Sequence, residues 1–186
     1  MPFAAKMFTR PMLTAFAFAA ALPAASGLAA ADDEAAFVAR YHADATAILA
    51  AIHADTAHPD QKQRFVTFSI HQDPTKYVKC GWIAKDTVIE CDAASGYFSA
   101  PQGQPRLYKI EHVGRVALKG LGYDLDDSEG DFQLFNPLNS PADIPTTADT
   151  ALKTLYEVYG VRPPAQTIDA EAPLAAPQAR PLADGK

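Results

Sequence analysis

The sequence predicts a small α+β domain, an antiparallel sheet of about five strands packed by helices, in the order α-β-β-β-α-β-β-α. Two observations support this. In three segments, apolar residues recur at steps of three and four, as on one side of a helix. Between these segments, short runs alternate apolar with polar residues, as in strands that are buried on one face.

The first helix and the first strand are the clearest elements. Residues 34–54 carry large apolar side chains at helical spacing, with charged residues between them. Val66, Phe68 and Ile70 then alternate with polar residues, which predicts a half-buried strand. Asp73-Pro74 supplies the turn that follows it.

The next two apolar runs predict a hairpin that carries both cysteines of the chain. Residues 77–84 and 87–93 flank the dipeptide Lys85-Asp86. If this dipeptide is the turn, the strands pair so that Cys80 lies directly opposite Cys91, close enough for a disulfide bond. An even pair of cysteines in an exported protein is most often structural. We therefore expect a structural disulfide rather than a redox site, which would favour a Cys-x-x-Cys spacing at a helix N-terminus.

The second half of the domain adds two helices and two short strands. Apolar steps of three and four predict a helix over residues 106–121. Residues 123–125 and 132–135 are strand candidates around a Ser-Glu-Gly turn. The last helix is expected to begin at Thr146 and to end before Gly160.

The first 31 residues resemble a cleavable signal peptide. Lys6 and Arg10 precede an apolar run of about 11 residues, which is too short for a spanning helix of about 20. The small residues Ala29 to Ala31 predict cleavage after Ala31. Basic residues beside an alanine-rich run are typical of bacteria, so we expect export to the periplasm or secretion. Residues 32–162 would form one domain, and the Pro/Ala-rich residues 163–186 a disordered tail.

The charge of the mature chain argues against a nucleic-acid ligand. The full sequence has 16 Lys+Arg and 22 Asp+Glu. Removing Lys6 and Arg10 with the signal leaves 14 − 22 = −8. A chain this acidic repels phosphate backbones.

No residue pattern predicts catalysis, a metal ion or a cofactor. His42 and His53 would share a helix face but lie about 16 Å apart, too far to hold one ion. The acidic stretch from Asp124 to Asp131 lacks the Gly and Glu that an EF-hand needs, so a solvated hairpin tip is expected, with a weak cation site as the alternative. Ser69 with His71, or Ser95, could act as nucleophile and base, but no nucleophile-elbow motif accompanies them.

Several local patterns resemble the TY-Chap family of type III secretion chaperone-like domains, distant relatives of the YbjN family. The matching features are the run Tyr77 to Ala93, Gly96-Tyr97-Phe98, Leu121-Gly122-Tyr123, Phe132 to Asn136, and Leu155 to Val161 with Pro163-Pro164. The resemblance implies a helix-backed antiparallel sheet that binds protein segments, often as a homodimer, with no catalytic residues. The secretion chaperones are cytoplasmic, whereas this chain carries a predicted signal peptide and a cysteine pair.

The alternation of the strands also predicts where a partner would bind. Three helices can hardly cover both faces of such a sheet, so one face should stay open. His71, Tyr77 and Lys79 fall on that face and are the candidate partner-binding residues. We therefore expect an exported, non-catalytic protein-binding domain. The alternative is a small periplasmic enzyme or metal-binding protein that uses histidine and acidic residues.

Overall fold

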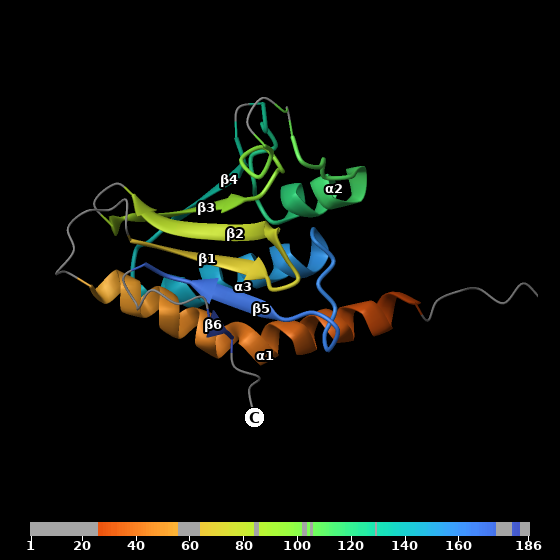
Figure 1. Ribbon diagram of the computed structural model, residues 1–186. Coiled ribbons are helices and arrows are strands. Elements are labelled where there is room, and N and C mark those ends of the chain that lie inside the picture. The colour runs from red at the N-terminus through yellow and green to blue at the C-terminus, as the bar shows by residue number, and fades with distance from the viewer. Residues whose placement is uncertain are drawn as a thin grey trace, which may run out of the picture.

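The computed structural model describes residues 26–55, 64–83, 86–101, 104, 106–128, 130–173 and 180–182 of the 186-residue chain. Its core is an antiparallel sheet with the strand order β4-β3-β2-β1-β5-β6 (Figure 1). The strands are β1 Phe65–Ile70, β2 Asp73–Ile83, β3 Val88–Ala93, β4 Phe132–Pro137, β5 Ile168–Glu171 and β6 Arg180–Pro181. The predicted α+β fold is confirmed.

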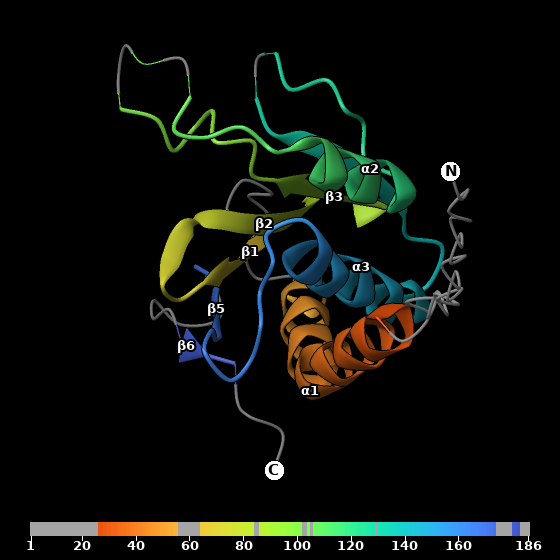
Figure 2. The ribbon, with the colours of Figure 1, turned by 90° about the vertical axis from the view of Figure 1, so that its right-hand side faces the viewer.

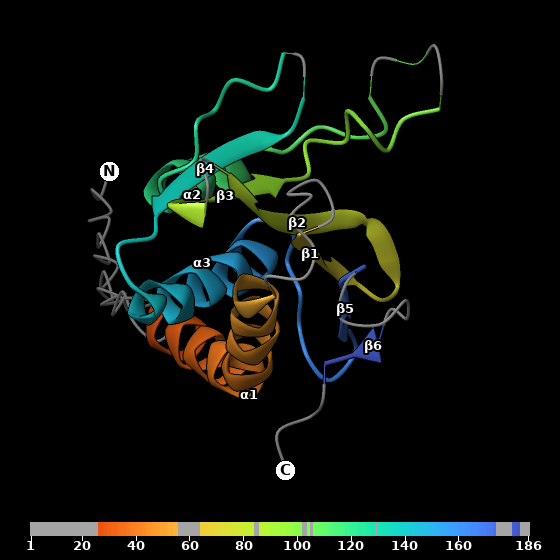
Figure 3. The same cartoon turned by 90° about the vertical axis from the view of Figure 1, so that its left-hand side faces the viewer.

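The helices lie against one face of this sheet. They are α1 Ser26–Ala54, α2 His112–Gly120 and α3 Ile144–Glu157, the last preceded by a short 3₁₀ turn, Pro141–Asp143. Figures 2 and 3, taken from opposite sides, show α1 and α3 packed together on the same side of the strands. Both helices bury leucines completely, such as Leu49 and Leu152, so their apolar stripes form the core with the sheet.

The face of the sheet under the helices is the one that the alternation predicts. Its side chains from β1 and β2 are almost fully buried, namely Val66, Phe68, Ile70, Val78, Cys80 and Trp82. The intervening residues of these two strands are only partly buried or exposed. The sheet is therefore apolar on one side and polar on the other, as expected for helices packed on a single face.

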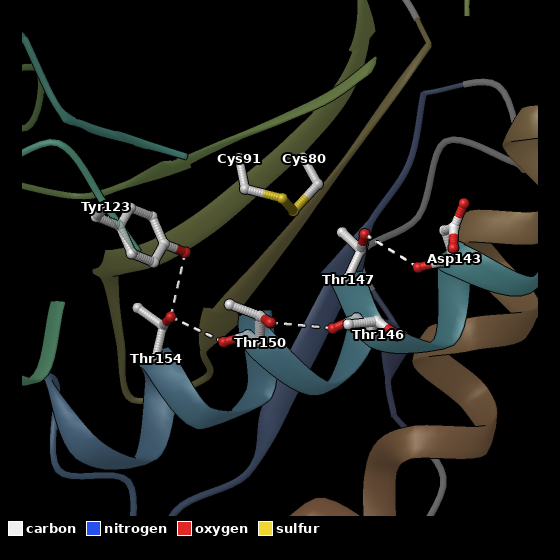
Figure 4. Close-up of a disulfide and its surroundings, with 8 residues drawn as sticks. All are labelled: Cys80, Cys91, Tyr123, Asp143, Thr146, Thr147, Thr150 and Thr154. Carbon is white, nitrogen blue, oxygen red and sulfur yellow. Dashed lines mark hydrogen bonds between the residues drawn. A yellow bond between two sulfur atoms is a disulfide. The ribbon is translucent and has the colours of Figure 1, made fainter. Parts of the chain in front are cut away.

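The predicted disulfide is present between β2 and β3. Cys80 and Cys91 are directly paired across the hairpin, with their Cα atoms 4.1 Å apart, and both are buried. Figure 4 shows the bridge facing a column of threonines on α3. Thr154 of this column donates to the Thr150 carbonyl at 2.8 Å, which satisfies a buried hydroxyl of the core. The bridge is thus part of the core, and it fits an oxidising, exported compartment.

A buried arginine joins the end of α1 to the β2–β3 hairpin. Arg64 donates to the carbonyls of Ile52 and His53 at 3.1 and 2.9 Å, in the last turn of α1, where carbonyls run out of helical N–H partners. The same guanidinium pairs with Asp86 at 2.6 Å. Asp86 has a positive φ of 69°, as a tight hairpin turn requires. This contact fixes the helix against the hairpin that carries the disulfide.

Two elements differ from the prediction in the middle of the chain. The second helix begins at His112 rather than near residue 106. Leu107 instead donates its N–H to the Gly96 carbonyl at 2.9 Å and closes a loop. Residues 123–125 are not a strand, although Asp124 donates to the Gln133 carbonyl of β4 at 2.8 Å. In both cases a backbone hydrogen bond holds a loop where a regular element was predicted.

The predicted disordered tail is wrong for residues 163–173 and 180–182. Strand β5 pairs with β1, and β6 pairs with β5. Ile168, Ala170 and Leu182 are buried, so a short alternation of apolar residues completes the edge of the core. Residues 174–179 and 183–186 lie outside the described residues.

The predicted signal peptide falls mostly outside the described part of the chain. Residues 1–25 are not described, and α1 already begins at Ser26, ahead of the expected cleavage site after Ala31. Cleavage there stays a prediction. Within the described residues, none of the helices combines the length and the apolar character needed to cross a membrane.

Removal of the disulfide should destabilise the domain. In the chain-entropy model, a bridge that closes a loop of about 12 residues stabilises the fold by about 3 kcal/mol. We expect the double variant Cys80→Ala/Cys91→Ala to melt about 10 °C lower than the wild type in calorimetry. Thiol titration of the native protein should find no reactive sulfhydryl. An unchanged melting temperature, or two titratable thiols, would contradict a structural role.

Candidate functional site

The face of the sheet opposite to the helices is open, and we call it the outer face. Figures 2 and 3 show α1 and α3 on the other side of the strands. Its side chains on β1 to β4 are all partly buried or exposed. They include Phe65, Thr67, Ser69, Tyr77, Lys79, Ile83, Val88, Glu90, Asp92, Gln133, Phe135 and Pro137, with Gly81 among them.

One cross-strand row of the outer face forms the floor of a hollow. Lys79 of β2 pairs with Asp92 of β3, and Asp92 pairs with Gln133 of β4. The hollow above this row measures about 770 Å³. We call it the acidic hollow, and its walls are Phe98, Asp124, Asp126, Ser128, Gly130 and Asp131. Side chains from three strands therefore meet residues from two loops.

The first of these loops follows β3 and is closed at its base by a glycine. Gly96 has a φ of 83°, and a Cβ atom there would lie only 2.5 Å from the Tyr108 carbonyl oxygen. No other residue type fits such a backbone without a shift of the chain. The chain at Gly96 thus passes close to the Tyr108 backbone. Phe98, two residues later, lies at the rim of the acidic hollow, where its ring is beside Gly130.

A buried carboxylate fastens both loops to the sheet. Asp131 is 7% exposed, and its Oδ2 accepts the Tyr77 hydroxyl at 2.5 Å. Its Oδ1 accepts the backbone N–H of Ser95 at 2.9 Å. The Ser95 hydroxyl lies 2.7 Å from the Gly130 carbonyl and 3.1 Å from Asp131 Oδ1. Burial, then the hydrogen bond and charge of Asp131, hold the pKa of Tyr77 well above its usual range, so this hydroxyl stays a donor.

A second group of polar contacts holds the loop that contains Asp124, Asp126 and Asp127. Asp127 pairs with Arg106 at 2.5 Å and with Arg115 at 3.2 Å. Arg115 also donates to the Leu125 carbonyl at 2.8 Å. The loop is thus tied to the start of α2, and the charge of Asp127 is compensated.

Asp124 and Asp126 line the hollow and, unlike Asp127, are held by backbone N–H groups. Asp124 accepts the N–H of Asp126 at 3.0 Å, and Asp126 accepts the N–H of Ser128 at 3.0 Å. These bonds orient the two carboxylates without neutralising them, because the donors are uncharged amides. The loop therefore presents negative charge to the hollow.

Asp92, in the floor of the hollow, has a raised pKa. Partial burial raises the pKa of its carboxyl to about 6, with further contributions from the negative charges of Glu90 and Asp131. Lys79 and the Gln133 side chain lower it only in part. The floor of the hollow therefore holds a carboxylate whose charge is poorly compensated, as at many functional sites.

The structure separates the three residues predicted to contact a partner. Lys79 lies in the floor of the hollow, with its Nζ 4.3 Å from the Phe65 ring centroid. Tyr77 lies beside the hollow and is bound to Asp131. His71 is exposed at the β1–β2 turn, where its Nδ1 lies 2.8 Å from Asp169 Oδ2, and it does not line the hollow. Their roles in binding stay predictions.

Other residues of the site were missed at the level of sequence. Asp92, Phe98 and Gly81 belong to segments of the family resemblance but were not identified as site residues, although the predicted hairpin register already placed Asp92 opposite Lys79. Ser95, considered as a nucleophile, is fully buried and serves to hold the loops. Within the described residues, no group of three or more His, Cys, Asp or Glu side chains is arranged to hold a metal ion.

Comparisons with known proteins add no assignment. A scan against protein-family models, a search of curated proteins and a search of solved structures each found no match. The TY-Chap and YbjN resemblance therefore stays a prediction.

The Tyr77 to Asp131 hydrogen bond should matter for stability. We expect Tyr77→Phe to lower the free energy of unfolding by about 1–3 kcal/mol, because it leaves a buried carboxylate short of one donor. Tyr97→Phe is the matched control, since Tyr97 is exposed. Urea denaturation measures both variants. Equal stability of Tyr77→Phe and the wild type would show that the bond does not anchor the loops.

The raised pKa of Asp92 predicts a pH-dependent effect of its removal. Its folded pKa of about 6 exceeds the unfolded value of 3.8, so its contribution to stability is greatest below pH 3.8 and is lost as pH rises through 6. We expect Asp92→Asn to melt higher than the wild type at pH 7.5, and this gain to shrink towards pH 4. The control Asp126→Asn should show no gain at pH 7.5, because hydrogen bonds from Ser128 lower the pKa of Asp126. A pH-independent difference for Asp92→Asn would refute this assignment.

Proposed function

We propose that this protein is an exported, non-catalytic binding domain that holds a segment of another protein on its outer face. The disulfide fits an oxidising compartment, and the predicted signal peptide leads to the bacterial periplasm or to secretion. The resemblance to TY-Chap and YbjN domains favours the same class of function.

The observation that carries the proposal is the mixture of aromatic and polar side chains on a sheet face that none of the described helices covers. Phe98 is 66% exposed and Phe135 is 50% exposed, one at the rim of the acidic hollow and one on β4. Aromatic residues are enriched in protein interfaces, and they are costly to leave in water. A face of this kind is suited to contact with another chain.

The polar groups of the site favour binding over catalysis. Ser95, the candidate nucleophile beside the hollow, is buried and hydrogen-bonded to Asp131 and to the Gly130 carbonyl. A nucleophile must be able to reach its substrate, and Ser95 cannot. The accessible part of the site is a broad surface with a hollow, a shape suited to contact with another protein.

Site-specific crosslinking tests the proposal. p-Benzoylphenylalanine would replace Phe135 on the outer face, or Ala50, an exposed residue of α1. After irradiation of the source cells, we expect a protein adduct of defined mass from position 135, identifiable by mass spectrometry, and none from position 50. Adducts from position 50 alone, or from neither position, would contradict binding on the outer face. Equal melting temperatures of the two variants control for folding.

A further inference from the structure

We infer that the bound segment is basic, and that its Lys or Arg side chains enter the acidic hollow and a notch above Gly81. This inference rests on the proposed function, because it names the chemistry of the segment that the outer face would hold. It follows from three features: the charge balance of this face, a glycine that the fold does not require, and an aromatic rim.

The charge balance of the site is strongly negative. The acidic side chains around the floor are Glu90, Asp92, Asp124, Asp126 and Asp131. Lys79 is the basic side chain among the described residues that line the hollow. Its ammonium group already lies over the Phe65 ring. A cation that enters the hollow is therefore attracted by several carboxylates and repelled by one positive charge, that of Lys79.

Two other carboxylates of the chain, Asp127 and Asp169, have basic side chains beside them. Asp127 has two arginine partners, and Asp169 lies beside His71. The hollow and the neighbouring notch together have one lysine against five acidic residues, of which Asp131 is already hydrogen-bonded by Tyr77 and Ser95. The contrast favours an external partner that supplies the missing positive charge.

Gly81 forms a notch in the middle of the outer face. It lies in one cross-strand row with Phe65, Glu90 and Phe135. A small hollow of about 140 Å³ lies there, and it shares Lys79 and Asp92 with the acidic hollow. The notch is thus next to the larger hollow and has an aromatic ring on one side and carboxylates on the other.

The fold itself does not require a glycine at this position. The described glycines with positive φ are Gly96, Gly122 and Gly160, and Gly81 is not among them. A Cβ atom at residue 81 would lie 3.4 Å from the Phe65 Cβ, an ordinary contact. Glycine inside a strand lowers stability and often marks a close approach of another chain. The missing side chain at residue 81 leaves room for one from the partner.

A long cationic side chain fits the chemistry of this notch. A guanidinium or ammonium group there would lie near the face or edge of Phe65 and near the carboxylates of Glu90 and Asp92. It would combine cation–π attraction with charge-assisted hydrogen bonds. The raised pKa of Asp92 agrees with this, because a bound cation would relieve the repulsion from Glu90 and Asp131.

Defined peptides test the charge preference of the site. Three fluorescein-labelled peptides of about 12 residues would alternate Thr with Lys, Gln or Glu, and fluorescence anisotropy would measure their binding to the mature protein. In low salt we expect the Lys peptide to bind at least tenfold more tightly than the Gln peptide, and the Glu peptide not to bind. The affinity for the Lys peptide should fall when NaCl is raised to about 300 mM, as expected for screened charges.

Variants of the notch and of the hollow separate binding from stability. Gly81→Ala and Gly81→Thr should keep or raise the melting temperature, since both residues suit a strand better than glycine, but weaken Lys-peptide binding at least fivefold. Asp92→Asn should weaken it similarly. The matched control is Asp149→Asn, which removes the same charge from α3, where Asp149 pairs with Lys153. This control should bind like the wild type.

The outcomes distinguish the inference from the proposed function. Three results would each contradict the inference that the bound segment is basic. They are equal affinity for the Lys and Gln peptides, no binding of any peptide, and wild-type binding by Asp92→Asn and both Gly81 variants. If crosslinking from position 135 still gives an adduct, binding on the outer face stands and only the chemistry of the segment is wrong. If crosslinking fails as well, both are wrong.

Discussion

The one-sided burial of the sheet governs the rest of this structure. Alternation in β1 and β2 directs Val66, Phe68 and Val78 towards α1 and α3, and the opposite side chains away from them. A slip of one residue in the β2–β3 pairing would exchange the two faces. The Cys80–Cys91 bridge, buried under α3, fixes that pairing. It thereby also fixes the row that forms the floor of the acidic hollow.

The walls of the hollow depend on polar contacts rather than on apolar packing. Asp131 binds Tyr77 and Ser95, while Asp127 binds two arginines, so the two loops are held at fixed positions above the sheet. Asp92 and its acidic neighbours repel one another, which costs stability in the free protein. Binding sites commonly retain such unfavourable features because the partner relieves them. A basic segment would do so here.

The sequence was most informative where a short-range pattern decides the structure. Period-two alternation predicted the buried face, and the symmetry of the hairpin predicted the facing cysteines. The acidic hollow could not be predicted in this way, because the fold brings Asp92 of β3 together with Asp124, Asp126 and Asp131 of the loop that precedes β4. Strand β5 was missed because the proline- and alanine-rich composition of the tail hid the alternation of Ile168 and Ala170. Leu107 was assigned to a helix because its spacing suited one, although it closes a loop.

The most direct test of the central claim is an NMR titration of the mature protein with the Lys peptide. Binding on the outer face predicts that amide chemical shifts change mainly in residues 79–81, 90–92 and 124–133, and that the amides of α1 and α3 change little. The same titration should leave the buried side chains between α1, α3 and the sheet unperturbed. Shift changes confined to α1 and α3 would place the contact surface on the helices and contradict the account.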